Sequence, residues 1–111
     1  MKNIQLTCAH ALVKFLIAQK TLIDGKKEPL FPGVFGIFGH GNVACLGQAL
    51  QENQKNLPTW RGHHEQNMAL TGIAYSRAKR RKQIFVATSS VGPGSTNMIT
   101  AAAVAMSNRL P

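Results

Sequence analysis

The stretch that decides the fold is "IFVATSSVGPGSTNMITAAAVAMSN", residues 84–108. Its first seven residues are rich in β-branched and aromatic side chains, and they predict a strand over 84–90. The glycines and proline of "VGPG", 91–94, predict a turn, and Ser95 is expected to cap a helix over 96–108. A strand, a glycine-rich turn and a helix in succession form the basic unit of an α/β protein.

Two more units of this kind come earlier in the chain. "GVFGIF", 33–38, predicts a short buried strand, "GHGN", 39–42, a turn, and 43–51 a helix. "NLPTWRG", 56–62, contains a weaker strand, and "HEQNMALTGIAYSRAKR", 64–80, is the clearest helix. Strands that alternate with helices imply a parallel sheet with helices on both faces, so we expect an α/β fold.

A further helix is expected before the first strand, over residues 7–19, with Thr7 as its cap. "LIDGKKEPLFPG", 22–33, is expected to be a loop because of its Asp-Gly pair, lysines and prolines. The helix is predicted to be covered on most sides. Its apolar face would comprise Cys8, Leu12, Phe15 and Leu16, with Val13 and Ile17 as a second edge.

The length of the chain, 111 residues, allows one domain at most. Three short parallel strands bury little apolar surface, so residues 1–111 are expected to be part of a longer chain. No apolar run is long enough to span a membrane, and "MKNIQLTCAH" lacks the apolar segment of a signal peptide. Cys8 and Cys45 show neither metal-site nor disulfide spacing, which favours a reduced, cytoplasmic setting.

The formal net charge is +9, and five of the thirteen basic residues lie between Arg77 and Lys82. Such a run could bind nucleic acid or another anionic surface. It could equally be a solvated helix end, where cations complement the helix dipole. No aromatic residues are interleaved for stacking on bases, so the helix end is favoured. Acidic segments elsewhere in a longer chain would also explain the imbalance.

Carboxylates are scarce, and one of the four stands in an unusual place. Asp24, Glu28 and Glu52 lie in stretches that are expected to be exposed, whereas Glu65 opens a helix that is expected to be buried. One interpretation is a glutamate that only complements the helix dipole. The other is a carboxyl group placed to share a proton with a ligand nitrogen.

The turns that could surround Glu65 follow predicted strands. Ligands of an open parallel sheet bind beyond the carboxyl ends of its strands, so "GHGN" and "GPGSTN" should share one rim with Glu65. Both turns could also be plain βα connections. "GHGNVA" matches a dinucleotide-binding fingerprint, but only weakly, because Glu65 opens a helix. The zinc motif H-E-x-x-H is absent, since Met68 stands four residues after His64.

Two segments resemble the pyrimidine-binding domain of thiamine-diphosphate enzymes: "HHEQNMALTGIAYSRAKRR" and "TSSVGPGSTNMITAAAVAMSNRLP". They share an acid, a helix of small residues, and a strand that ends in G-P-G-x-x-N. Within that superfamily, "FGIFGHGNVACLGQAL" is similar to the trihydroxycyclohexanedione hydrolases of myo-inositol breakdown. The resemblance extends from Leu6 to Pro111 and implies a flavodoxin-like fold.

The resemblance also implies roles for particular residues. Glu65 would hydrogen-bond N1′ of the aminopyrimidine and favour its imino tautomer. The full-length enzyme would open a carbon–carbon bond of a cyclic diketone to give 5-deoxyglucuronate. His40 would either assist proton transfer or only order its loop. The cofactor would be held by Glu65, Asn97, Gly92, Pro93 and Gly94, and the turn that faces cofactor and substrate would be Gly39, His40, Gly41 and Asn42.

The sequence departs from this superfamily in one respect: no G-D-G motif occurs. The diphosphate and Mg²⁺ would therefore be bound by a domain outside these residues. The family's central domain would also lie outside them. The family's active sites form between chains, so a homodimer or tetramer is expected, without nucleic-acid or membrane partners, and the 111-residue chain alone should be inactive. Two alternatives are an acetohydroxyacid synthase-like enzyme and a non-enzymatic nucleotide- or nucleic-acid-binding module.

Overall fold

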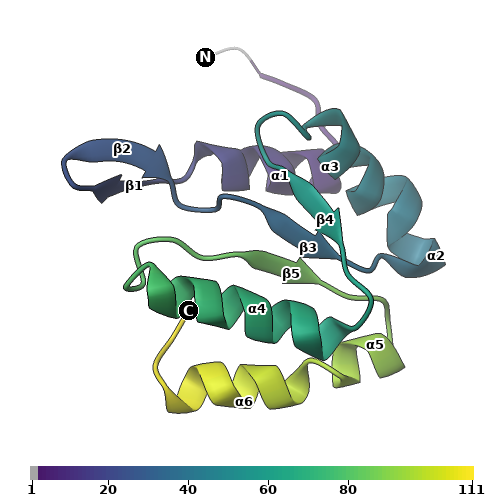
Figure 1. The fold of residues 1–111 in the computed structure, drawn as a ribbon. Helices are drawn as coiled ribbons and strands as arrows, with labels where there is room; N and C mark the ends of the chain where they lie inside the picture. The colour runs from purple at the N-terminus through teal and green to yellow at the C-terminus, as the bar shows by residue number, and fades with distance from the viewer. Residues whose placement is uncertain (1–2) are drawn as a thin grey trace.

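The computed structural model describes residues 3–111 and is built around a three-stranded parallel sheet (Figure 1). Its strands are β3 (Val34–Gly36), β4 (Thr59–Arg61) and β5 (Val86–Thr88). Their order is β4-β3-β5, so Phe35 of the central strand lies opposite Trp60 on one side and Ala87 on the other. Within the described residues β4 and β5 are thus the two edges. The predicted α/β fold with a parallel sheet is confirmed.

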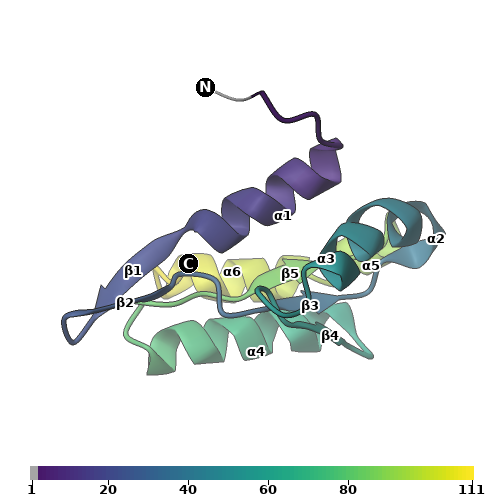
Figure 2. The ribbon, with the colours of Figure 1, turned by 90° about the horizontal axis from the view of Figure 1, so that it is seen from above.

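Helices cover both faces of this sheet (Figure 2). On one face lie α1 (Cys8–Ala18) and α3 (Gln48–Glu52), which contact each other. On the other face lies α4 (Glu65–Ala78), and α6 (Ile99–Ser107) packs against α4. None of the helices in residues 3–111 combines the length and the apolar character that a membrane span requires.

The main core lies between the sheet and the α1–α3 layer. Side chains alternate in direction along a strand, so Val34 points into this core while Phe35 points to the α4 side. The core is aliphatic, and its members are almost completely shielded from water. They are Val13, Leu16, Val34, Ala49, Leu50 and Leu57.

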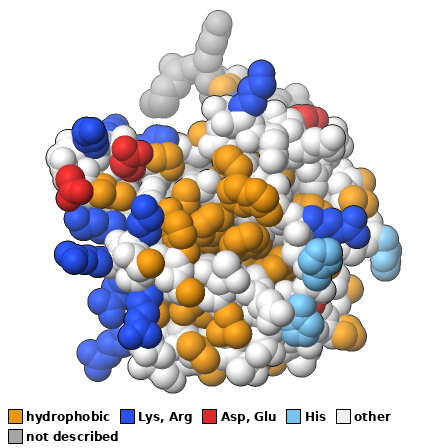
Figure 3. All heavy atoms as spheres, viewed as in Figure 1, with side chains coloured by type: hydrophobic (Ala, Val, Ile, Leu, Met, Phe, Trp, Pro, Cys, Tyr) orange, Lys and Arg blue, Asp and Glu red, His pale blue; other side chains and the backbone are white. Residues whose placement is uncertain are grey.

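The α4 side of the sheet carries aromatic rings instead. Phe85 stacks on Phe35 with ring centroids 4.8 Å apart, and Tyr75 of α4 meets Phe85 edge-on, also at 4.8 Å. Trp60 of the edge strand lies 5.8 Å from Phe85 and is 46% exposed. Hydrophobic side chains accordingly gather in the middle of this face of the molecule (Figure 3). One helix covers this face incompletely, so the aromatic layer is in part open to solvent.

Helix α1 confirms the predicted cap but not the predicted face. Thr7 Oγ1 accepts a hydrogen bond from the backbone N–H of His10, as a helix cap does. The prediction that the helix is covered on most sides is wrong, because Leu12 is 46% and Phe15 59% exposed. The helix turns Val13 and Leu16 to the core. The buried face thus combines Leu16 of the predicted face with Val13 of the predicted second edge, and α1 contacts α3 on this layer.

The predicted loop over 22–33 contains an antiparallel hairpin, which corrects the expectation. Its strands are β1 (Lys20–Ile23) and β2 (Lys26–Pro29). Asp24 and Gly25 at the turn have φ angles of 50° and 79°. Two successive positive φ values are what a tight two-residue hairpin turn needs, and an Asp-Gly pair is suited to them.

The first glycine-rich turn after a strand is helical from its first residue. "GHGN", predicted as a turn, is α2 (Gly39–Asn42), and a π-helical turn over Val43–Gly47 joins it to α3. The chain therefore enters the helix earlier than predicted, because the positive φ of Gly39, 64°, redirects the backbone within one residue.

The C-terminal helical region is also divided differently from the prediction. Ser95 is not a cap: it lies within α5 (Pro93–Thr96), and its hydroxyl donates to the carbonyl of Ser90 at 2.9 Å. Gly92, with φ 62°, makes the turn, and Pro93 opens the short helix, a position that suits its fixed φ. The predicted single helix over 96–108 is thus α5 followed by α6.

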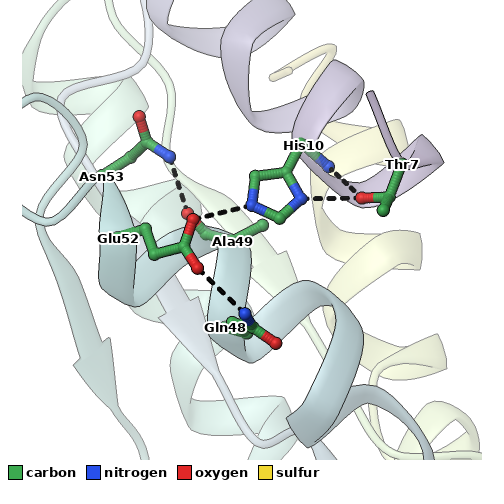
Figure 4. A network of polar contacts seen from close by, with 6 residues as sticks. All are labelled: Thr7, His10, Gln48, Ala49, Glu52 and Asn53. Carbon is green, nitrogen blue, oxygen red and sulfur yellow. Dashed lines mark hydrogen bonds and ion pairs between the residues drawn. The ribbon is translucent and has the colours of Figure 1, made fainter. Parts of the chain in front are cut away.

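A polar network links α1 to α3 (Figure 4). His10 Nε2 lies 2.8 Å from Glu52 Oε2, and His10 Nδ1 lies 2.7 Å from Thr7 Oγ1. Gln48 Nε2 donates to the second carboxylate oxygen of Glu52 at 2.9 Å. The hydrogen bond to His10, aided by that from Gln48, holds the pKa of Glu52 below its usual value. The network ties the N-terminal helix to the layer that covers the core.

Candidate functional site

The expectation that Glu65 is a buried acid at a helix start is confirmed. Glu65 is the first residue of α4, and it is only 8% exposed. Its Oε2 accepts a hydrogen bond from Asn97 Nδ2 at 3.3 Å, across 32 residues of sequence. The preceding residue, His64, is extended and makes no side-chain cap. Glu65 is therefore a buried carboxyl group at the rim beyond the carboxyl ends of the strands.

The "GPG" turn gives Glu65 its space. A Cβ atom placed on Gly94 would lie 2.7 Å from Glu65 Oε1 and would also collide with the hydroxyl of Ser90. Only a residue without a side chain lets the α5 backbone approach the carboxylate this closely. Gly94 therefore lies beside Glu65, and Gly92 and Pro93 directly precede it in the chain.

The "GHGN" turn lines a cavity whose other side is formed by Ser90 and Val91, just before Gly92. The cavity has a volume of about 480 Å³ and lies at the carboxyl ends of β3 and β5. A Cβ on Gly39 would come within 2.8 Å of Ser90 Cβ, so the first turn packs against the residue just before the second. The lining includes all four predicted turn residues; its members are Phe38, Gly39, His40, Gly41, Asn42, Ser90 and Val91.

Three lining residues were not singled out from the sequence: Phe38, Ser90 and Val91. Their signal was position, because each follows directly after a predicted strand or stands at its last residue. Ser90 lies in the segment that carries the resemblance, but no role was assigned to it there, and its place depends on the packing of the Gly39 and Gly94 backbones against it. Such a contact between two turns is a property of the assembled sheet.

The histidines beside Glu65 lie apart from the cavity between the turns. His63 and His64 are exposed and border a separate depression of about 240 Å³ that Arg61 and Met68 also line. Within residues 3–111 no group of three or more histidine, cysteine, aspartate or glutamate side chains could hold a metal ion. His63 and His64 are therefore polar residues of the loop before α4, and His64 makes no side-chain cap.

The carboxyl group of Glu65 at this rim can form hydrogen bonds and exchange a proton with a ligand. Asn97 donates to one oxygen of Glu65, while the other oxygen lies against the Cα of Gly94. Such a group can accept a hydrogen bond from an N–H of a heteroaromatic ring when it is ionised, or give its proton to a ring nitrogen when it is protonated. Because the group is 92% shielded from solvent, such a bond would face little competition from water.

The family of the chain follows from a comparison with known proteins. Residues 22–111 match the family described as thiamine pyrophosphate enzyme, N-terminal TPP binding domain. This match covers the whole parallel sheet, Glu65 and both glycine-rich turns. The chain belongs to this family, and the resemblance noted in the sequence is confirmed.

Individual relatives narrow the class further. The chain is 53% identical over its full length to the 3D-(3,5/4)-trihydroxycyclohexane-1,2-dione hydrolase of Geobacillus thermodenitrificans. Enzymes of the same name from Bacillus thuringiensis and Clostridium tetani are 51% and 50% identical over the same 111 residues. In each case the chain spans 17% of the length of the relative.

Proposed function

We propose that these residues are the pyrimidine-binding part of a longer thiamine-diphosphate-dependent hydrolase, which opens a carbon–carbon bond of trihydroxycyclohexane-1,2-dione. The observation that carries the proposal is the shielded carboxyl group of Glu65, placed between Asn97 and the Gly94 backbone. The names of the relatives support the substrate class, and the family supports the cofactor.

The residues present fit the pyrimidine end of this cofactor. An aminopyrimidine is flat and carries ring nitrogens, so it needs a backbone that approaches closely and a carboxyl group at one edge. Gly92 and Gly94 supply the bare backbone, and Glu65 supplies the carboxyl group. When bound, thiamine diphosphate supplies a carbon nucleophile that also stores electrons during carbon–carbon bond cleavage.

The role of the chain is to hold a proton at a defined atom. We infer that Glu65 bonds N1′ of the pyrimidine and that Asn97 orients the carboxyl group through Oε2. Glutamate suits this task because it both accepts a hydrogen bond and exchanges a proton, whereas glutamine only hydrogen-bonds. Gly94 allows the α5 backbone to approach the Glu65 carboxylate closely, since any side chain there would displace the carboxylate.

The rest of the active site is divided, in this proposal, between this chain and other regions of the enzyme. Gly39, His40, Gly41 and Asn42 line the cavity beside the turn of Gly92, and they would face cofactor or substrate. The diphosphate and Mg²⁺ would be bound outside these residues, because no G-D-G motif occurs here. A cytoplasmic homo-oligomer, and a 111-residue chain without activity of its own, are further parts of the proposal that rest on the family.

The decisive experiment replaces Glu65 by glutamine in the full-length enzyme. We expect the fold to be unchanged and turnover to fall by about 10²–10⁴-fold, the usual contribution of a positioned acid–base group. The matched control is Glu52→Gln, which removes an exposed carboxylate far from the rim and should leave turnover unchanged. Exchange of the C2 proton of the bound cofactor, followed by NMR, should slow in the first variant. An unchanged exchange rate would contradict the role of Glu65.

A second measurement tests the division between domains. The 111-residue chain should bind thiamine diphosphate poorly in a calorimetric titration, because the diphosphate group finds no dedicated site. Micromolar affinity would show that the diphosphate is bound by these residues.

A further inference from the structure

The end of the molecule opposite the glycine-rich turns contains a second cavity. It has a volume of about 370 Å³ and lies where α4 and α6 both end. Three arginines line it, together with two residues that follow α6; the lining comprises Arg77, Arg80, Arg81, Asn108 and Leu110. Lys and Arg side chains crowd the corresponding edge of the surface, at the left of Figure 3.

The backbone around this cavity adopts a conformation that side chains disfavour. Within residues 3–111, four non-glycine residues have a positive φ: Asp24, Arg80, Arg81 and Arg109, at 50°, 52°, 63° and 51°. Three of these are arginines at the C-terminal ends of α4 and α6. Glycine is the usual residue at such helix ends because it has no Cβ. These positions therefore present guanidinium groups at the expense of local backbone stability.

The guanidinium of Arg81 is fixed in place. Its Nε donates to the carbonyl of Arg109 at 3.0 Å, and Nη2 donates to the carbonyl of Asn108 at 3.4 Å. The backbone N–H of Arg81 in turn donates to the backbone carbonyl of Ser76 at 2.8 Å, which holds the end of α4. Arg81 thus bridges the ends of both helices and keeps a preformed orientation at the cavity.

The positive charge here exceeds what the fold itself compensates. Six cations lie close together: Arg77, Lys79, Arg80, Arg81, Lys82 and Arg109. Two helix C-termini contribute about one negative charge in total, and Asp24 contributes one more through Lys82, at 3.9 Å. In the described part of the chain none of the three arginines of the cavity pairs with a carboxylate. About four positive charges are left without a partner.

We propose that this cavity binds a small, multiply charged oxyanion of the phosphate class, either inorganic phosphate or a phosphate ester. Guanidinium groups match the geometry of phosphate oxygens and can bind them in pairs. The cavity has the size of a small-molecule site, for which about 300–1,000 Å³ is typical. This ligand site lies at the opposite end of the sheet from Glu65, so it is separate from the proposed cofactor site.

A nucleic acid fits the cavity less well. Binding of single strands relies on aromatic side chains that stack with the bases. The aromatic residue nearest in sequence, Tyr75, is already engaged: the ammonium of Lys79 lies 5.6 Å from its ring centre, and its hydroxyl donates to Gln83 at 2.9 Å. The charge and the size of the cavity therefore favour a compact ligand.

The test uses the full-length enzyme saturated with thiamine diphosphate, with inorganic phosphate and glycerol 3-phosphate as probes. Binding is followed by calorimetric titration and by the midpoint of thermal unfolding, with sodium chloride at equal ionic strength as the reference. We expect saturable binding and a higher midpoint with phosphate than with chloride, because a ligand that binds only the folded state stabilises it. A stronger effect of the ester would identify an organic phosphate as the preferred ligand.

The double variant Arg77→Gln and Arg80→Gln should weaken binding at least tenfold. Neither side chain forms a hydrogen bond or ion pair in the described structure, so folding should be preserved, which circular dichroism checks. Its matched control is Lys14→Gln with Lys55→Gln, which removes two exposed cations elsewhere. Equal weakening in both variants, or no saturation, would overturn the proposal. Tight binding of a random DNA duplex that displaces phosphate at physiological salt would also overturn it, in favour of a nucleic-acid surface.

Discussion

The two faces of the sheet are built differently, although the same three strands supply both. Towards α1 and α3, aliphatic side chains such as Val34 and Leu50 are almost completely buried. Towards α4, the aromatic rings of Phe35, Trp60 and Phe85 contact one another but are in part exposed. Stability conferred by burial depends on the area removed from water, so the α1–α3 face should contribute more to it. The α4 face contributes ring contacts and the position of Glu65.

The largest difference should come from truncating the aliphatic face. Leu50→Ala removes a side chain that is 1% exposed, and we expect it to cost about 2–5 kcal/mol of unfolding free energy. Leu12→Ala is the matched control, since Leu12 is exposed on the same layer, and it should cost less than about 1 kcal/mol. Urea unfolding followed by circular dichroism measures both. Equal losses would mean that α1 and α3 do not form the core described here.

The aromatic face should respond more weakly. Phe85→Leu keeps most of the apolar volume but removes the ring pairs with Phe35 and Tyr75, for an expected cost of about 1 kcal/mol. Trp60 is the only tryptophan, so its fluorescence should also change. Met106→Ala, at an exposed position of α6, should change neither quantity. If Phe85→Leu cost as much as Leu50→Ala, the contrast between the faces would be wrong.

The smallest expected effect concerns the polar link above the aliphatic face. The pKa of Glu52 is lowered in the folded chain, chiefly by its hydrogen bond to His10, so the link stabilises the fold above the ordinary glutamate pKa of 4.5. This stabilisation should be lost as the pH falls below 4.5 and through the lowered pKa. Urea midpoints measured across that range should therefore decrease more steeply for the native chain than for Glu52→Gln. Parallel curves would show that the link does not depend on the charge of Glu52.

Much of this architecture could be predicted from local sequence. The periodicity of α4 and the β-branched run of β5 identified the α/β fold, and the scarcity of carboxylates pointed to Glu65. The hairpin was missed because an Asp-Gly pair marks both loops and tight turns, and only the pairing of Lys20–Ile23 with Lys26–Pro29 distinguishes them.

Other features depend on contacts between distant segments. The buried face of α1 was mispredicted because apolar residues occupy most sides of the helix, and the face that is buried, with Val13 and Leu16, depends on how the helix packs in the assembled core. Ser90 could not be recognised as a site residue, since its place is set by the backbones of Gly39 and Gly94, far from each other in sequence. Likewise, the bond from Asn97 to Glu65 spans 32 residues and follows from the order of the strands.

The strand order has a consequence for how the chain behaves at high concentration. With β3 in the centre, the outer edges of β4 and β5 each present backbone donors and acceptors that no other strand satisfies within residues 3–111. Such edges act as templates for pairing with another chain. Association through them is bimolecular, so its rate should rise with the square of the protein concentration. Dilute samples of the 111-residue chain would then report on folding and ligand binding, and concentrated ones on aggregation.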